Sequence, residues 1–188
     1  MASTSLQISC RLAFVDDAAA VARVHAESWR TTYQGILPES VVANRDARRY
    51  QEFWQGNIKA RRSIVLVAED AQTNVVGFVS FGLPREKGVT FDAEIYALYV
   101  LQGHQRQGVG RTLLAEVARR LVRQGLFSFY LWALKSNPAR LFYDALGAEE
   151  LTERDERIGD FAVKEVAYVW RDLSRFVAPH QSNAPAVE

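Results

Sequence analysis

Residues 94–114 read EIYALYVLQGHQRQGVGRTLL, and this stretch decides the fold. It begins inside a run of β-branched and aromatic residues, 91–101, whose composition is typical of a β-strand. Apolar residues at Val109, Leu113 and Val117 then follow the spacing of one helix face. Because glycines separate the two parts, the stretch predicts a strand, a tight turn and a helix.

The sequence on either side predicts the other elements of a layered domain. We expect strands at residues 6–12, 64–68, 75–83, 127–134 and 162–173 and helices at residues 21–29, about 39–57 and 138–146. The element order is then β-α-α-β-β-β-α-β-α-β. The predicted strands 91–101 and 127–134 are joined by a helix, and such a strand–helix–strand crossover requires one parallel pair of strands. We therefore expect an α/β (α+β layered) fold, with a mixed, mostly antiparallel central sheet flanked by helices.

Length and charge limit the class of protein. A chain of 188 residues predicts a single domain, which we place at residues 6–173, and we expect the patternless tail 178–188 to be disordered. The 23 basic and 22 acidic residues leave a net charge of +1. This balance excludes the strongly basic surface that a nucleic-acid-binding protein normally carries.

Cysteine and histidine usage argues against a metal site. Cys10 is the single cysteine and is expected to pack as a small hydrophobe, and the three histidines form no ligand pair. One of them, His25, lies on the apolar face of a predicted helix and is expected to be a core residue. No apolar run approaches the roughly 20 residues that cross a bilayer, and the N-terminus lacks the pattern of a signal peptide. We expect a cytoplasmic protein with no metal and no membrane partner.

The glycine turn predicts an anion site. Glycines let the backbone approach a ligand closely, and the free amides at the start of a helix bind phosphate. A Walker A loop is excluded because Val109, and not lysine, follows Gly108. A dinucleotide fingerprint is disfavoured because Leu113 stands at its third glycine. The remaining alternatives are an acyl-coenzyme loop and a turn that only precedes a helix.

Two motifs in order favour the coenzyme loop. The pattern Gln105-x-x-Gly108-x-Gly110 resembles the coenzyme A pyrophosphate loop of the GCN5-related N-acetyltransferases (GNAT), and Asn137-x4-Phe142-Tyr143-x3-Gly147 is similar to that family's next conserved element. The resemblance extends over residues 6–173. It implies the GNAT fold and an acetyl-CoA-dependent N-acetyltransferase. Gly103 stands near a position where relatives often carry proline, so the loop path is expected to differ slightly there.

The resemblance also implies which residues bind acetyl-CoA. Backbone groups of the central strand are expected to pair with the pantetheine arm, the loop to hold the pyrophosphate, and the following helix to contact the coenzyme. In that order these residues are Leu98, Tyr99 and Val100; Gln105, Arg106, Gln107, Gly108, Val109, Gly110 and Arg111; and Asn137 and Arg140.

Two further residues are implied as catalytic. Tyr143 stands where the family places a tyrosine near the sulfur, and its phenol would protonate the leaving thiolate, unless it is only a packed core residue. Glu94 stands where several relatives place a catalytic carboxylate. It is expected on the same strand face as Tyr96 and Leu98, as a base acting directly or through water, as an acceptor-binding group, or as a solvated edge charge.

The acceptor is the least determined part of the site. Trp29 and Tyr33 stand where relatives line the acceptor pocket, with core packing as the alternative. Residues 102–125 carry a local charge of +4, which suits a phosphate-bearing cofactor, and residues 144–165 a local charge of −5, which suits a cationic amine. We expect a direct attack by a primary amine of a polyamine-like metabolite, an antibiotic or a protein N-terminus. A non-catalytic acyl-CoA-binding module is the alternative function, and a homodimer is the assembly that many relatives adopt.

Overall fold

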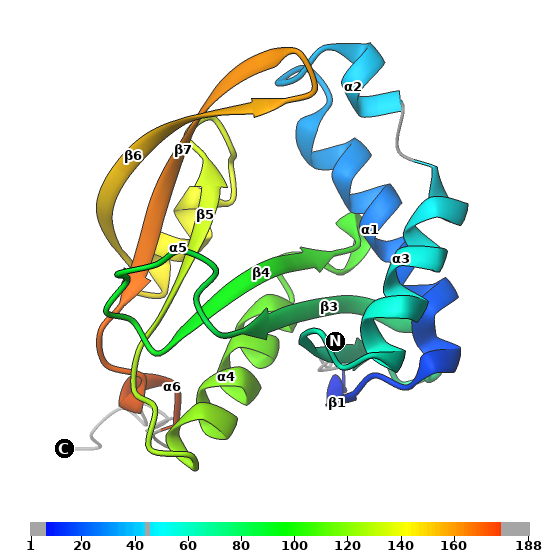
Figure 1. The fold of residues 1–188 in the computed structure, drawn as a ribbon. Coiled ribbons are helices and arrows are strands. Elements are labelled where there is room, and N and C mark those ends of the chain that lie inside the picture. The colour runs from blue at the N-terminus through cyan, green and yellow to red at the C-terminus, as the bar shows by residue number, and fades with distance from the viewer. Residues whose placement is uncertain (1–6, 44–45, 178–188) are drawn as a thin grey trace, which may run out of the picture.

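The computed structural model describes residues 7–43 and 46–177, and seven strands in this part of the chain form one sheet (Figure 1). The strands are β1 (Ser9–Leu12), β2 (Ile64–Glu69), β3 (Val75–Gly82), β4 (Ala93–Val100), β5 (Phe129–Leu134), β6 (Glu149–Ile158) and β7 (Phe161–Trp170). The helices are α1 (Ala18–Tyr33), α2 (Glu39–Ala43), α3 (Ala47–Lys59), α4 (Val109–Val122), α5 (Arg140–Ala145) and α6 (Ser174–Val177), with short 3-10 turns η1 (Val15–Asp17) and η2 (Gln102–His104). None of the described helices is long and apolar enough to cross a membrane.

The sheet opens at its only parallel neighbours among the described strands. The strand order is β1-β2-β3-β4-β5-β7-β6, and β4 with β5 is the parallel pair. These two strands pair over just three residues each, Ala93–Ile95 against Phe129–Leu131. Beyond that point β4 follows β3 and β5 follows β7, so the two strands diverge (Figure 1). The mixed, mostly antiparallel sheet is confirmed, and the divergence ends the backbone pairing of β4 with β5 in the middle of the sheet; we call this interruption of the sheet the opening.

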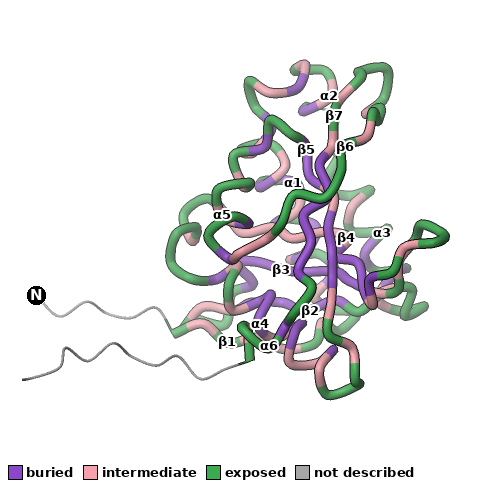
Figure 2. The backbone as a smooth tube through the Cα atoms, turned by 90° about the vertical axis from the view of Figure 1, so that its left-hand side faces the viewer, coloured by how far each residue is buried: buried purple, intermediate pink, exposed green. Residues whose placement is uncertain are grey.

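Helices cover both faces of the sheet because the strand side chains alternate. Leu66 and Val79 point to one face and pack with Leu113 of α4, whereas Val67 and Phe78 point to the other and pack with residues of α1 and α3. Figure 2 shows the buried backbone running through the central strands, with the exposed stretches at the loops and outer helices.

One strand, β6, is absent from the predicted element order. Its sequence EELTERDERI is the acidic segment, and none of its ten residues is buried. It pairs with β7 alone and forms an edge of the sheet, so backbone pairing rather than an apolar pattern specifies it. The structure also divides the predicted helix 39–57 into α2 and α3. Residue 6, the tail 178–188 and His180 lie outside the described residues.

A β-bulge in β4 corrects the predicted direction of Glu94. Ser80 of β3 pairs with Ala97, whereas the next residue, Phe81, pairs with Ile95, so Tyr96 is an extra residue on β4. The extra residue reverses the alternation of side chains. Leu98 packs toward α4, but Glu94 lies on the opposite face, the face that α1 and α3 cover farther along the sheet. The expectation that Glu94 shares the face of Leu98 is wrong.

Candidate active site

The glycine loop forms an exposed cradle at the start of α4. Gly108 has φ +84° and caps the helix, a left-handed conformation that favours glycine. Its carbonyl accepts the Thr112 amide at 2.9 Å, so the amides of residues 109–111 have no acceptor within the helix. Arg106 and Arg111 are exposed beside these amides. Free amides, the helix dipole and two guanidinium groups are donors that fit a pyrophosphate.

The two sequence motifs meet in space at Gly110. A Cβ atom added to Gly110 would lie 2.9 Å from Cζ of Phe142, so the α5 ring occupies the place of a side chain. Contact between the first and second motif thus sets the distance between α4 and α5. This packing positions Asn137 and Arg140 near the loop end of the opening. Asn137 is buried, and its side-chain oxygen accepts the Ala139 amide at 2.9 Å in the turn before α5, whereas Arg140 is exposed.

The predicted loop glutamines hold the loop itself. The Gln105 side-chain amide donates to the Val100 carbonyl at 3.0 Å, and the Gln107 amide donates to the Gly103 carbonyl at 2.9 Å. The strand residues expected to pair with pantetheine, Leu98 to Val100, are partly exposed and lie beyond the part of β4 that pairs with β5. The structure therefore brings the predicted coenzyme residues into one continuous path, from the open edge of β4 to the first turn of α4.

Tyr143 is buried on α5 beside the opening. Its ring packs against Tyr168 and Trp170, with centroids 5.1 and 6.1 Å away. Burial, together with the nearby Tyr33 and Tyr168, raises the pKa of Tyr143 above its ordinary value of 10. The phenol is therefore protonated at neutral pH and can act as a proton donor.

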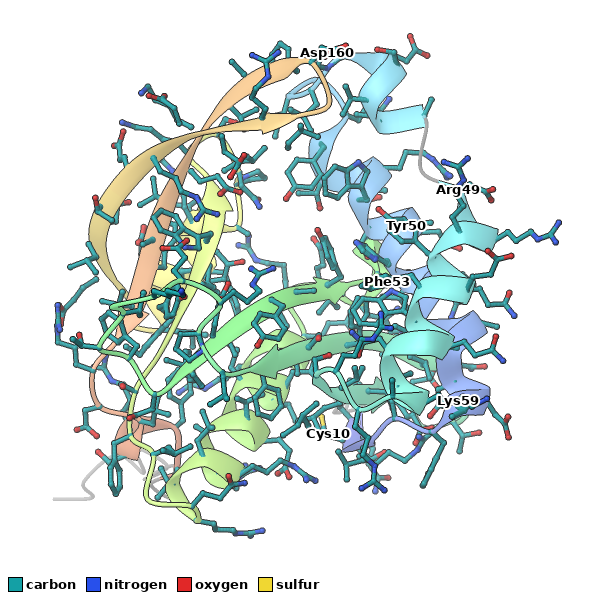
Figure 3. All side chains as sticks on the ribbon, in the orientation of Figure 1. Cys10, Arg49, Tyr50, Phe53, Lys59 and Asp160 are labelled. Atoms are coloured by element: carbon teal, nitrogen blue, oxygen red, sulfur yellow. The ribbon has the colours of Figure 1, made fainter. Side chains whose placement is uncertain are left out.

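Tyrosines from the other face approach Tyr143 through the opening. Burial raises the pKa of Tyr99 well above its ordinary value, with further contributions from Tyr33, Tyr50 and Tyr143 and from a side-chain hydrogen bond with Tyr33. The Asn137 amide donates to the Tyr33 hydroxyl at 3.5 Å, which joins α1 to the turn after β5. Figure 3 shows Tyr50 reaching from α3 toward α1. We call Tyr33, Tyr50, Tyr99 and Tyr143 the hydroxyl cluster.

Glu94 lies in a separate, fully bonded cluster. It is 1% exposed, which removes the alternative of a solvated edge charge. One carboxylate oxygen accepts the Arg85 Nε at 2.9 Å and the Arg85 Nη2, and the other accepts the Arg85 backbone amide at 2.8 Å and the Tyr130 hydroxyl at 3.0 Å. All four acceptor positions of the carboxylate are filled. Because Arg85 and Tyr130 take these positions, the Glu94 carboxylate makes no hydrogen bond with Tyr143, and the structure does not bring the two predicted catalytic residues into contact.

Aromatic and apolar side chains cover the opening on the α1 face of the sheet. The rings of Trp29 and Tyr33 lie 4.3 Å apart. Residues of α2 and the β6–β7 hairpin complete this roof, and Figure 3 places Asp160 at the hairpin tip beside α2. The apolar cluster, which we call the roof cluster, contains Tyr33, Leu37, Val42 and Leu134, with Trp29, Ile36, Val41, Tyr99, Ile158 and Val163 packed against it.

Sequence reasoning missed three residues of the α1 face, namely Arg85, Tyr130 and Arg154. Arg154 of β6 lies over the Trp132 ring, with its guanidinium carbon 3.9 Å from the ring centroid, and it pairs with Glu165 and Glu86. These contacts depend on strand pairing and on a loop that folds back, so no local motif marks them. The even spacing of Tyr130 and Trp132 on β5 is the one signal that places both on the same face.

Cys10 and His25, which we expected to have structural and not catalytic roles, both contact neighbouring residues in the fold. Burial raises the pKa of Cys10 to about 11, so its thiol is protonated at neutral pH. His25 is half-buried and accepts a hydrogen bond from Trp54 Nε1 at its Nδ1 atom, 3.2 Å away.

Comparison with known proteins identifies the family. The model of the acetyltransferase (GNAT) family matches residues 22–148. The chain is also 37% identical over 169 residues to YuaI, an uncharacterized N-acetyltransferase of Bacillus subtilis, covering 89% of this chain and 95% of that protein. The chain belongs to the GNAT acetyltransferase family. It is an acetyl-CoA-dependent N-acetyltransferase.

More distant relatives of this acetyltransferase are consistent with that family. It is 24% identical over 136 residues to the spermidine N(1)-acetyltransferase of Thermoplasma acidophilum, and the aligned region covers 70% of this chain and 81% of that protein. Its fold matches the PaiA N-acetyltransferase of the same organism in complex with coenzyme A, with a TM-score of 0.67, 23% identity and coverage of 85% and 98% of the two chains. It also matches YncA of Salmonella typhimurium with its cofactor acetyl-CoA, with a TM-score of 0.63, 19% identity and coverage of 95% and 99%. Coenzyme A or acetyl-CoA is bound in those two structures.

Proposed function

We propose that this acetyltransferase transfers the acetyl group directly from acetyl-CoA to a primary amine of a small cationic molecule. The observation that carries the proposal is the opening between β4 and β5, with the predicted coenzyme path and Tyr143 on the α4 side and an aromatic, acidic surface on the α1 side. Three carboxylates surround the Arg154 guanidinium on that side, which leaves an excess of negative charge there; they are Glu86, Glu156 and Glu165. The buried Glu94 carboxylate is paired with Arg85.

A small acceptor fits this surface better than a folded protein. The roof cluster joins the β6–β7 hairpin to α1 and α2 above the opening, which narrows the approach from the α1 side. The relative of Thermoplasma acidophilum is a spermidine N(1)-acetyltransferase, and spermidine is a slender chain of the charge that the surface favours. A protein N-terminus is the competing acceptor.

The proposed reaction needs no covalent enzyme intermediate. The neutral amine nitrogen attacks the thioester carbonyl carbon, the carbon–sulfur bond breaks, and the leaving thiolate of coenzyme A takes the Tyr143 proton. A backbone amide near Leu98 to Val100 would polarise the carbonyl. The products are the acetamide and free coenzyme A, and Tyr143 recovers a proton from solvent.

We assign the amine proton to Glu94 through Tyr130. Of the donors that fill the Glu94 carboxylate, the guanidinium and the backbone amide have no lone pair that accepts a proton. The Tyr130 hydroxyl both donates and accepts. A proton therefore reaches Glu94, with its bonds to Arg85 intact, when Tyr130 takes it and passes its own proton on; the same relay in reverse returns the proton to solvent after the product has left.

The test of the acceptor is a thiol-release assay with acetyl-CoA and a panel of amines. The panel contains spermidine, putrescine, an aminoglycoside, lysine and an unblocked alanyl peptide, and calorimetry measures acetyl-CoA binding independently. We expect turnover with the polyamines and at least tenfold lower kcat/KM with the peptide. A higher kcat/KM with the peptide would overturn the assignment of a small cationic acceptor. Tight binding of acetyl-CoA with no turnover of any amine would overturn the proposal that a primary amine attacks the thioester directly.

Tyr143→Phe tests the proton donor. The ring packing against Tyr168 and Trp170 is retained, so the unfolding midpoint should stay close to that of the unaltered protein. We expect kcat to fall about 100-fold, within the range for general acid catalysis, with little change in the amine KM. Steady-state kinetics at saturating acetyl-CoA give both constants. An unchanged kcat would assign Tyr143 to core packing.

Glu94→Gln and Tyr130→Phe test the proton route. Each variant should lower kcat/KM at least tenfold and remove the ascending limb of its pH profile, because each interrupts the same path. The double variant should be no slower than the slower single one. Glu116→Gln is the control, since it loses two ion pairs on α4 outside the site. An intact ascending limb in Glu94→Gln would leave Glu94 with an acceptor-binding role only.

A further inference from the structure

Tyr99 points away from the coenzyme path that its own backbone borders. Its neighbours on β4, Leu98 and Val100, pack toward α4, whereas the Tyr99 ring packs toward α1 and α3 and contacts the roof cluster. The residue lies on the part of β4 that has left β5. Tyr99 thus presents its side chain to the face from which the amine is proposed to enter.

Packing fixes the direction of the Tyr99 ring. The His25 imidazole lies between Tyr50 and Tyr99, with ring centroids 3.9 and 4.7 Å away and interplanar angles of 27° and 30°. Trp54 donates to Nδ1 of His25, which sets the orientation of the imidazole. Phe78 supports the stack from β3, 5.8 Å from Tyr99. A hydroxyl on a ring held in this way has little freedom to move.

The Tyr99 hydroxyl retains capacity for another hydrogen bond. Its raised pKa keeps it neutral and protonated, and a hydroxyl has one donor and two acceptor positions. The side-chain bond with Tyr33 uses one of these positions. At least one lone pair therefore remains, beside Tyr143 and within the opening.

We propose that Tyr99 positions the acceptor amine. Its hydroxyl accepts a hydrogen bond from one N–H of the neutral amine and directs the nitrogen lone pair toward the thioester carbon, while the Tyr33 hydroxyl orients Tyr99. No proton is transferred to Tyr99. The inference rests on the proposed direct attack and adds to it the residue that aligns the nucleophile, and such alignment lowers the entropic part of the barrier.

Tyr99→Phe is the test, because it removes the hydroxyl and keeps the ring in the stack. We expect kcat with the preferred amine to fall 10- to 50-fold. In calorimetry, the amine should bind the enzyme–coenzyme A complex at least threefold more weakly, while acetyl-CoA affinity and the unfolding midpoint stay unchanged. The pH dependence of kcat/KM should keep its shape, which separates positioning from proton transfer.

Tyr96→Phe is the matched control on the same strand. Its hydroxyl donates to the Leu83 carbonyl at 2.5 Å, outside the hydroxyl cluster, and its loss should leave kcat within about twofold. Equal effects of the two substitutions, or a Tyr99→Phe enzyme with unaltered kcat and amine affinity, would overturn the inference. If Tyr99→Phe is unstable, Tyr33→Phe removes the orienting partner and should lower kcat in the same direction. Failure of the unaltered enzyme to turn over any amine would instead overturn the proposed direct attack.

Discussion

The two glycines of the loop before α4, the predicted coenzyme loop, are required for different physical reasons. Gly108 adopts φ +84° with no neighbour within 4 Å of an added Cβ, whereas Gly110 is limited by the Phe142 ring at 2.9 Å. Gly110→Ala should therefore overpack the contact between α4 and α5 and lower the free energy of unfolding by about 1–3 kcal/mol. Because the same contact sets the position of Asn137, the acetyl-CoA Kd should rise about tenfold. Urea unfolding and calorimetry measure the two effects.

Matched variants separate steric from backbone requirements at this loop. Phe142→Leu in the Gly110→Ala background should recover most of the lost stability and affinity, because it vacates the space that the new methyl group needs. Gly108→Asn should cost less than about 1 kcal/mol, since asparagine tolerates the left-handed conformation. Equal losses in both single glycine variants would contradict the distinction. The motif spacing located this loop from sequence, but the partner of Gly110 lies on α5, and the two residues meet only after folding.

At the scale of elements, the β6–β7 hairpin links the edge of the sheet to the acceptor side. Ile158 and Val163 of the hairpin pack on the roof cluster. Ile158→Ala should lower the free energy of unfolding by about 1 kcal/mol, because the residue is only half-buried. It should speed hydrogen exchange at the hairpin tip and raise the amine KM several-fold, with acetyl-CoA affinity unchanged. Leu151 is an exposed leucine at the other end of β6, so Leu151→Ala should leave the free energy of unfolding, the hydrogen exchange of the hairpin tip and the amine KM unchanged.

The elements that sequence predicted correctly are those whose side chains are patterned by burial. Strands β3 and β5 are buried almost throughout and appear as continuous apolar runs, whereas helices α1 and α4 each bury one apolar face, which is visible as a period in the sequence. Two features have no such period. The β6 strand is exposed at an edge, so its charged residues predict a solvated segment, and the Tyr96 bulge exists only relative to β3. Both features lie on or determine the α1 face of the sheet. The position of Tyr143 on α5 could therefore be predicted from a local motif, whereas the residues around Glu94 could not.

Across the whole molecule, the opposed charges of the sequence lie at different parts of the site. Arg106 and Arg111 of the positive segment are exposed at the coenzyme loop, whereas Arg119 and Arg120 pair with Glu116 on α4. The acidic segment forms the β6–β7 hairpin, where Arg154 and Lys164 neutralise part of it. The opening in the sheet lies between these two regions, so in the proposed reaction acetyl-CoA and a cationic amine would approach from opposite faces without competing for the same surface.

The phenols to which we assign roles in the site should also make the whole fold sensitive to alkali. Burial raises the pKa of Tyr99 and Tyr143 above their ordinary value, and that of Tyr168 to about 12. Above about pH 10 the unfolded chain loses these protons while the folded protein keeps them, so the free energy of unfolding must fall as the pH rises. Tyr99 and Tyr143 alone contribute a slope of about 3 kcal/mol per pH unit in this window. Urea unfolding between pH 10 and 11.5 should show at least that slope, lowered by about 1.4 kcal/mol per pH unit in Tyr99→Phe, and the tyrosinate absorbance should rise together with loss of the fold. Ionisation of these phenols in the folded protein near pH 10 would show that the opening admits water freely and that neither phenol is held in its neutral form.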